Sequence, residues 1–127
     1  MVQPSVKIEV YGIENVQKYL EKNEDAAHKA VADAMNQVGL YMEKEVKSSI
    51  AGERAEHTSV DTGHLMQSVT ADSDEGGAVV YTDVEYGKFI EYGTTRMAPR
   101  SHFRNSLARN KSKINQFVQD AIKKNVK

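Results

Sequence analysis

The chain has 127 residues, a length that fits a single domain with its own hydrophobic core. It contains no cysteine, which excludes disulfides, thiolate metal sites and cysteine nucleophiles. No apolar run approaches the roughly 20 residues of a membrane span, and no signal peptide is visible at the N-terminus. We therefore expect one domain, residues 1–127, that acts where it is made.

The charges are unevenly distributed, although the net charge is only −1. Residues 1–95 carry 8 basic and 17 acidic side chains, whereas residues 96–127 carry 9 basic and 1 acidic. Such asymmetry is typical of a nucleic-acid-binding arm. It is also typical of a head-to-tail contact, in which the basic end of one subunit meets the acidic face of the next. A merely solvated basic face is the third interpretation.

The first half of the chain predicts a strand followed by two helices. Apolar and charged residues alternate from Val6 to Tyr11, the pattern of a half-buried strand. A short helix is expected to run from Ile13 to about Lys22. A longer helix is expected over residues 24–50, because apolar residues recur there at spacings of three and four: Ala27, Ala30, Val31, Ala34, Met35, Val38, Met42, Val46 and Ile50.

The middle of the chain predicts a loop and a β-hairpin. Residues 51–63 show no periodicity and are expected to form the loop. Strands are expected over residues 65–71 and 78–82, with the acidic, glycine-containing segment 72–77 as the turn between them. Residues 84–93 fit either one helical turn or a strand.

The last segment predicts a loop over residues 94–99 and a final helix that begins near Pro99 or Ser101. The apolar stripe of this helix comprises Phe103, Leu107, Ile114, Phe117, Val118 and Ile122, and its outer face is basic. Helices and strands are segregated along the chain, so the predicted fold class is α+β. We expect the long N-terminal helix and the C-terminal helix to pack on a small, mainly antiparallel β-sheet.

The sequence gives only weak evidence for catalytic or metal-binding groups. Asp61-Thr62-Gly63 matches the tripeptide of aspartic proteases, but it follows a polar loop, which favours a turn into the next strand. His57, Asp61 and His64 could supply three metal ligands from one loop, although exposed loop side chains are the commoner case. No Gly-x-Ser-x-Gly elbow surrounds any of the candidate serines, which are Ser48, Ser49 and Ser68. We expect no enzyme activity, no cofactor and no metal site.

The basic run near the C-terminus is the stronger candidate for binding. Arg96, Arg100 and Arg104 are spaced by four, so the latter two could share a helix face. Arginines in this arrangement bind phosphates, and they also pair with carboxylates of a neighbouring protein. Composition alone does not decide between these partners.

Three motifs in one order resemble a known family of phage proteins. They are Val-Asp-Thr-Gly-His-Leu-Met-Gln-Ser-Val at residues 60–69, Tyr-Gly-Lys-Phe-Ile-Glu-Tyr-Gly-Thr at residues 86–94, and Met-Ala-Pro-Arg-Ser-His-Phe-Arg at residues 97–104. After a long N-terminal helix, this order is similar to the head–tail joining proteins of long-tailed bacteriophages, also called neck or tail-component proteins. The resemblance spans about residues 5–122.

The resemblance implies a structural virion protein that forms a ring, commonly of six subunits, at the head–tail junction. Such a ring joins the tail tube to the head connector and encloses the channel through which DNA passes. The implied partners are further copies of the chain, the tail tube or terminator protein, the head connector or stopper protein, and DNA that passes through the channel without sequence-specific binding. The implied location is the tail or neck of a virion assembled in the bacterial cytoplasm, away from any membrane.

Site residues follow from the same motifs. We expect a structural corner at Glu91, Tyr92, Gly93 and Thr94, with Gly93 in a backbone conformation that other residues resist. The same structural role is expected of Asp61, Thr62, Gly63 and Pro99. Contacts to a neighbouring subunit or ring are expected from Arg96, Arg100 and Arg104. The alternatives are a tail terminator that caps the tube, a small DNA-binding protein that uses the basic C-terminal helix, and a hydrolase built on Asp61.

Overall fold

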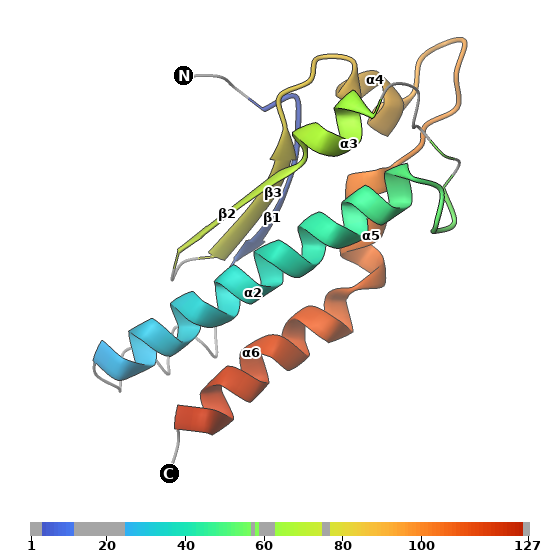
Figure 1. Ribbon diagram of the computed structural model, residues 1–127. Helices are drawn as coiled ribbons and strands as arrows, with labels where there is room; N and C mark the ends of the chain where they lie inside the picture. The colour runs from blue at the N-terminus through green and yellow to red at the C-terminus, as the bar shows by residue number, and fades with distance from the viewer. Residues whose placement is uncertain (1–3, 12–24, 57, 59–62, 75–76, 126–127) are drawn as a thin grey trace.

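The computed structural model describes residues 4–11, 25–56, 58, 63–74 and 77–125. A three-stranded antiparallel sheet lies against a long helix, with a two-part C-terminal helical segment beside it (Figure 1). The strands are β1 (Val6–Tyr11), β2 (Thr70–Asp74) and β3 (Gly77–Thr82), in the spatial order β1-β3-β2. The arrangement confirms the predicted α+β class and the first strand.

Helix α2 (Asp25–Ile50) is the central element of the core and confirms the predicted long helix. It packs on β2 and β3, and its buried apolar residues are Val31, Ala34, Met35, Val38, Met42, Val46 and Ile50. Gly39 faces the sheet at this contact, where a Cβ would lie at an ordinary contact distance of 3.5 Å from the Cβ of Ala71. The inner face of the sheet contributes Val6, Ile8, Ala78 and Val80, in the alternation that a strand imposes.

The predicted hairpin exists, but its first strand begins later than expected. Residues His64–Ser68 form a short helix, α3, and the strand begins at Thr70 instead of Leu65. Leu65 and Val69 are both buried, and their spacing of four is the helical period that the short apolar run concealed. Asp72 and Asp74, expected in the turn, pair in register with β3. Their side chains lie on the open face of the sheet, where a strand tolerates carboxylates.

The predicted single C-terminal helix is wrong, because two helices meet at Asn110. They are α5 (His102–Arg109) and α6 (Lys111–Asn125). The buried Asn110 side chain donates to the Ser106 carbonyl (2.7 Å) and to Glu45 Oε1 (3.2 Å), and it accepts from the Tyr41 hydroxyl (3.1 Å). These bonds hold a polar side chain at the bend between the two helices. Periodicity alone does not reveal such a bend.

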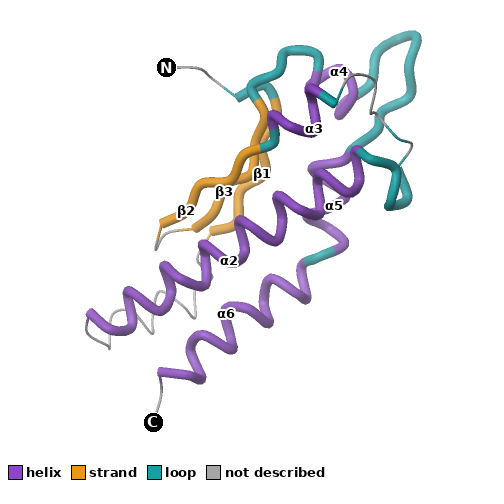
Figure 2. The backbone as a smooth tube through the Cα atoms, in the orientation of Figure 1, coloured by secondary structure: helices purple, strands orange, loops and turns teal. Residues whose placement is uncertain are grey.

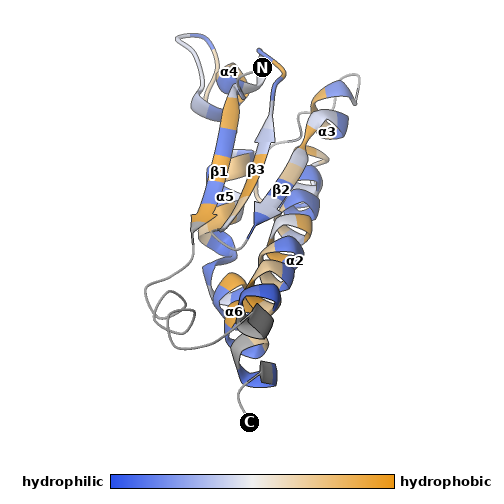
Figure 3. Ribbon diagram, turned by 90° about the vertical axis from the view of Figure 1, so that its left-hand side faces the viewer, coloured by the Kyte–Doolittle hydropathy of each residue, from blue (hydrophilic) through white to orange (hydrophobic). Residues whose placement is uncertain are grey.

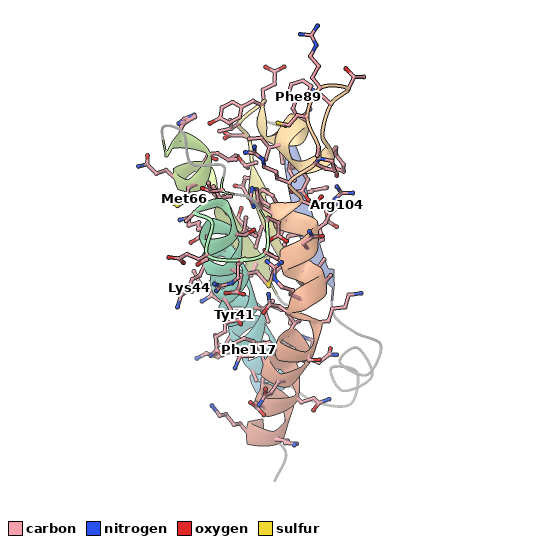
Figure 4. The ribbon with its side chains drawn as sticks, turned by 90° about the vertical axis from the view of Figure 1, so that its right-hand side faces the viewer. Tyr41, Lys44, Met66, Phe89, Arg104 and Phe117 are labelled. Atoms are coloured by element: carbon pink, nitrogen blue, oxygen red, sulfur yellow. The ribbon has the colours of Figure 1, made fainter. Side chains whose placement is uncertain are left out.

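The two C-terminal helices cover different parts of the molecule. Helix α5 packs on β1 and α2, whereas α6 packs along α2. Tyr41 and Phe117 meet edge to face across the α2–α6 contact, with ring centroids 5.5 Å apart (Figure 4). The outer face of the sheet carries no described helix (Figure 3). The molecule therefore has a helical side and an open sheet side.

Residues 84–93 contain a short helix, α4 (Gly87–Tyr92), so the helical alternative is the correct one. The predicted loop over residues 94–99 is present, with one bridge between Thr94 and Met97. The short helix predicted from Ile13 to Lys22 lies outside the described residues. None of the described helices combines the length and the apolar character that crossing a lipid bilayer requires.

Candidate functional site

Three short segments that are distant in sequence meet at one end of the molecule: α3, α4 and the start of α5 (Figure 2). Each lies in one of the three sequence motifs. A Cβ added at Gly87 would lie 3.4 Å from Leu65 Cδ1 and 3.1 Å from Thr82 Cγ2, so α4 sits directly on α3 and on the end of β3. The hydroxyls of Ser68 and Thr82 are bonded at 2.6 Å across the same contact. The motifs thus build one continuous structure.

The carboxylate of Glu91 joins α4 to α5. It is 1% exposed, and it accepts hydrogen bonds from the backbone N–H groups of Phe103 (3.0 Å) and Arg104 (2.9 Å). These two N–H groups belong to the first turn of α5, where a helix has no internal acceptors. The residue before the helix, Ser101, makes no side-chain cap. Glu91, ten positions before Ser101, therefore caps α5, and its negative charge suits the positive end of the helix.

Arg104 balances the charge of this buried carboxylate. Its Nε donates to Glu91 Oε2 (3.1 Å), and one Nη donates to the Glu91 carbonyl and to Ser101 Oγ, both at 2.8 Å. The guanidinium also lies over the Tyr92 ring, 4.3 Å from its centroid. Since the arginine side chain stays 49% exposed, it closes the pair towards solvent (Figure 4). Arg104 thus has a structural role within its own subunit.

Gly93 ends α4 with φ 78° and ψ 175°, a region that is essentially confined to glycine. A Cβ there would lie 2.8 Å from the Met97 carbonyl oxygen and 2.8 Å from the Pro99 nitrogen. Beyond it, Thr94 and Met97 exchange backbone hydrogen bonds of 2.9 and 3.3 Å around a two-residue turn. Glycine is therefore required here both by conformation and by space.

Arg96 stands at the tip of this turn. Its backbone N–H donates to Thr94 Oγ1 (3.2 Å), which stiffens the turn. The residue is exposed, and among the described residues its side chain makes no hydrogen bond or ion pair. The guanidinium of Arg96 thus remains available for a partner.

Arg100 lies before α5 rather than on it, so the predicted shared helix face with Arg104 is wrong. Its backbone N–H donates to the Ile90 carbonyl (2.6 Å), and its Nη1 donates to the Thr58 carbonyl (2.9 Å). Arg100 thereby links the loop after α2 to the segment before α5. Of the three arginines, two are engaged inside the subunit and one projects from it.

A second polar cluster lies beneath the loop that follows α2. The Glu56 carboxylate accepts hydrogen bonds from Ser49 Oγ (2.6 Å), Asn105 Nδ2 (3.0 Å) and Arg109 Nη1 (2.8 Å). Burial raises the pKa of Glu56, but the bonds from Arg109, Ser49 and Asn105 outweigh it and lower the pKa to about 2. The carboxylate therefore stays ionised and ties residue 56 to α2 and α5.

His102 is buried in the same cluster, 1% exposed. Its Nδ1 lies 2.7 Å from Ser49 Oγ, whose single hydrogen is directed to Glu56, so Nδ1 carries a proton and donates. The pKa of His102 is lowered to about 4, mainly by burial; the charge of Glu56 opposes this shift, and the positive charges of Arg100 and Arg109 add to it. The imidazole is neutral at pH 7. Nothing in the sequence pattern pointed to this histidine.

A serine, a histidine and a glutamate in contact invite comparison with a catalytic triad. In a triad the histidine stands between the other two and removes the serine proton. Here Ser49 stands between His102 and Glu56, and it is 0% exposed. The contact order and the burial both favour a structural role for these three residues.

The remaining predicted residues are placed as follows. Gly63 precedes α3 with φ 79° and ψ −5°, and Pro99 packs against Gly93. Asp61 and Thr62 lie outside the described residues, as does His57 of the imagined metal cluster. Within the part of the chain that the structure describes, no group of three or more histidine, aspartate or glutamate side chains could hold a metal ion.

Comparison with known proteins yields one match. A family model described as "Bacteriophage HK97-gp10, putative tail-component" matches residues 13–93, which is more than half of the chain. The matched range contains the first motif and nearly all of the second, but not the third. No curated protein and no solved structure matches.

Replacing Glu91 by glutamine tests the cap on α5. An amide has one acceptor oxygen and two donors, so one backbone N–H of α5 loses its partner inside the protein. We expect the free energy of unfolding to fall by about 2–4 kcal/mol, measured by urea denaturation at fixed protein concentration. The control is Glu9→Gln, which removes a surface pair with Lys7 and should cost less than about 1 kcal/mol. Equal costs would show that Glu91 is no cap.

Two alanine substitutions separate conformation from space at the glycines of the site. Gly63→Ala introduces a positive-φ alanine whose nearest neighbour is the Gln67 side chain at 3.8 Å, so it should cost about 1 kcal/mol. Gly93→Ala adds a clash with backbone atoms at 2.8 Å and should cost at least about 3 kcal/mol. Thermal and urea unfolding of the two variants measure the difference. Similar stabilities would contradict the corner geometry.

The buried histidine predicts a pH dependence of stability. Its folded pKa, about 4, lies below its usual 6.5, so between these values the unfolded chain binds the extra proton. Stability is therefore fully present above pH 6.5 and falls towards pH 4, by at most about 1.4 kcal/mol per pH unit from this group. His102→Asn keeps a donor to Ser49 but does not titrate, so its unfolding free energy should vary less over pH 6.5–4.5. An unchanged slope in His102→Asn would refute the assignment.

Proposed function

Because the chain belongs to the HK97-gp10-like family of bacteriophage tail components, we propose that it forms a homo-oligomeric ring at the head–tail junction of the virion. A ring of six would join the tail tube to the head connector and enclose the channel for DNA. The observation that carries the proposal is the convergence of α3, α4 and the start of α5 at one end of the molecule. There they form a stiff surface with exposed side chains, among them Tyr86, Phe89 and Tyr92.

The buried clusters support a structural role over an enzymatic one. A serine and a histidine, Ser49 and His102, are in hydrogen-bond contact at this end. The two residues are 0% and 1% exposed, so a substrate could not reach them. Their hydrogen bonds hold the loop after α2 against α5 instead. A protein whose polar networks are used in this way gains rigidity, which suits a subunit that must present fixed contact surfaces.

The internal pairing of arginines weakens the competing DNA-binding interpretation. Arg104 pairs with Glu91 and Arg109 pairs with Glu56, so neither offers its full charge to phosphate. The exposed cations of α6 are Lys111, Lys113, Lys123 and Lys124. A few lysines predict weak binding to duplex DNA with a shallow salt dependence, since the slope follows the number of phosphates neutralised. Such contact suits a channel through which DNA moves.

Light scattering of the purified protein, alone and with isolated tails, tests the ring. We expect a discrete oligomer in solution, or a monomer that assembles on tails. A monomer that ignores tails but binds duplex DNA with a steep salt slope would refute the proposal in favour of DNA binding.

Tails assembled without this chain separate the joining role from the terminator role. We expect tails of normal length that do not attach to heads, because a joining ring acts after the tube is complete. Tubes of uncontrolled length would assign the terminator role instead.

A further inference from the structure

Helix α4 and the residue before it present three exposed aromatic side chains, which together we name the aromatic end: Tyr86, Phe89 and Tyr92. They are 42%, 47% and 56% exposed, and their spacing of three places them on one side of the helix. Figure 4 shows Phe89 near one end of the molecule. Exposed tyrosine and phenylalanine with arginine nearby is the composition of a protein–protein interface.

The Arg96 turn lies beside the aromatic end and projects beyond α4 (Figure 1). Backbone bonds between Thr94 and Met97 and the packing of Gly93 hold this turn rigid. A preorganised turn loses little conformational entropy when it binds. Lys88, with its Nζ 5.3 Å from the Phe89 ring centroid, adds a second exposed cation. The aromatic end and its two cations therefore fit a partner surface that is apolar in its middle and acidic at its sides.

The open face of the sheet is such a surface. Strand register places Glu9, Val79 and Asp72 in one row across the three strands. Val79 and Tyr81 are half-buried in the middle, and Asp74 continues the acidic side along β2. On the β1 side, Glu9 is paired with the exposed Lys7 at 2.8 Å, so the excess of negative charge lies mainly on β2. The charge of Asp72, whose carboxylate accepts from the Tyr81 hydroxyl at 3.3 Å, raises the pKa of Tyr81. Figure 3 shows this face in front of α2, α5 and α6 with no described helix over it.

Contacts between like surfaces are the less favourable choice. Two Arg96 turns face to face would bring cation against cation, and two sheet faces would bring Asp72 against the carboxylates of the partner copy. A contact between the unlike surfaces pairs cations with carboxylates and aromatic rings with Val79 and Tyr81. Such a heterologous contact repeats from copy to copy and closes into a ring when the rotation permits.

We propose that the aromatic end and Arg96 turn of one copy dock on the open sheet face of the next copy. The inference rests on the proposed ring and identifies its subunit contact. Asp83 and Glu85, exposed on the connection before α4, oppose the attraction. In the proposed contact, the Arg96 turn therefore faces Glu9 and Asp72, and the connection that carries Asp83 and Glu85 does not.

Charge reversal of each surface tests the contact. The first variant is Lys88→Glu with Arg96→Glu, and the second is Glu9→Lys with Asp72→Lys. Each should raise the protein concentration needed for assembly, alone or on tails, by at least about tenfold. Mixed in equal amounts, the two variants should assemble as an alternating ring within about threefold of the wild type. One chain that carries all four substitutions should do the same.

The matched control is Lys111→Glu with Lys113→Glu on α6, which reverses two exposed cations outside the proposed contact. It should assemble like the wild type, and circular dichroism should show every variant folded. Wild-type assembly by both reversed variants would overturn the inference, as would loss of assembly in the α6 control alone. Either result would leave the proposed ring standing. A wild-type protein that forms no ring, even on tails, would refute both.

Cross-linking provides a direct measurement, because the chain has no cysteine of its own. A chain that carries both Arg96→Cys and Asp72→Cys should, after treatment with a short bismaleimide, give a ladder of covalent multimers that ends at the ring size. Lys113→Cys with Asp72→Cys is the control pair and should give mainly monomer. A ladder from the control pair and none from the first would place α6 on the sheet face and overturn the inference.

Discussion

The hydrogen bonds from the first turn of α5 to the Glu91 carboxylate are the constraint on which the functional end of the molecule depends. They fix the end of α4 to the start of α5, at 3.0 and 2.9 Å, in a site closed to water. The intervening segment must then turn back sharply, which Gly93 permits and Pro99 stabilises. Arg96 is held at the tip of that turn because both of its ends are anchored.

Carboxylates upstream of residue 96 also neutralise part of the positive charge of the C-terminal segment. Glu91 takes up Arg104, and Glu56 takes up Arg109, so the charge asymmetry of the sequence is partly cancelled within the fold. What remains exposed is a cationic turn beside aromatic rings and, elsewhere, an acidic sheet face. A subunit with two unlike surfaces of this kind is suited to repetition around a ring, whereas a uniformly basic face is suited to DNA.

Much of the fold could be predicted from the sequence, because long periodic segments report burial directly. The stripe from Val31 to Ile50 and the alternation from Val6 to Tyr11 correspond to α2 and β1. Short segments were less informative: the run that begins at Leu65 is too brief to separate a helix from a strand. The bend at Asn110 depends on bonds to Glu45 and Tyr41, which lie 65 and 69 residues away.

The site was only partly predictable for the same reason. Gly93 stood out as a glycine within a motif, but the cap by Glu91 joins residues in different elements, and sequence spacing carries no signal of it. The cluster of His102, Glu56 and Ser49 could not be predicted, because these residues meet only in the folded chain. The spacing of four suggests one shared role for Arg96, Arg100 and Arg104. Only their different contacts in the folded chain distinguish them.

Electron cryo-microscopy of the complete particle would show directly where this chain lies. We expect a closed ring of this chain between the tail tube and the head, with the α4 end of each copy against the sheet face of the next. Copies distributed along the tail tube, or a mature particle that lacks the chain, would contradict it.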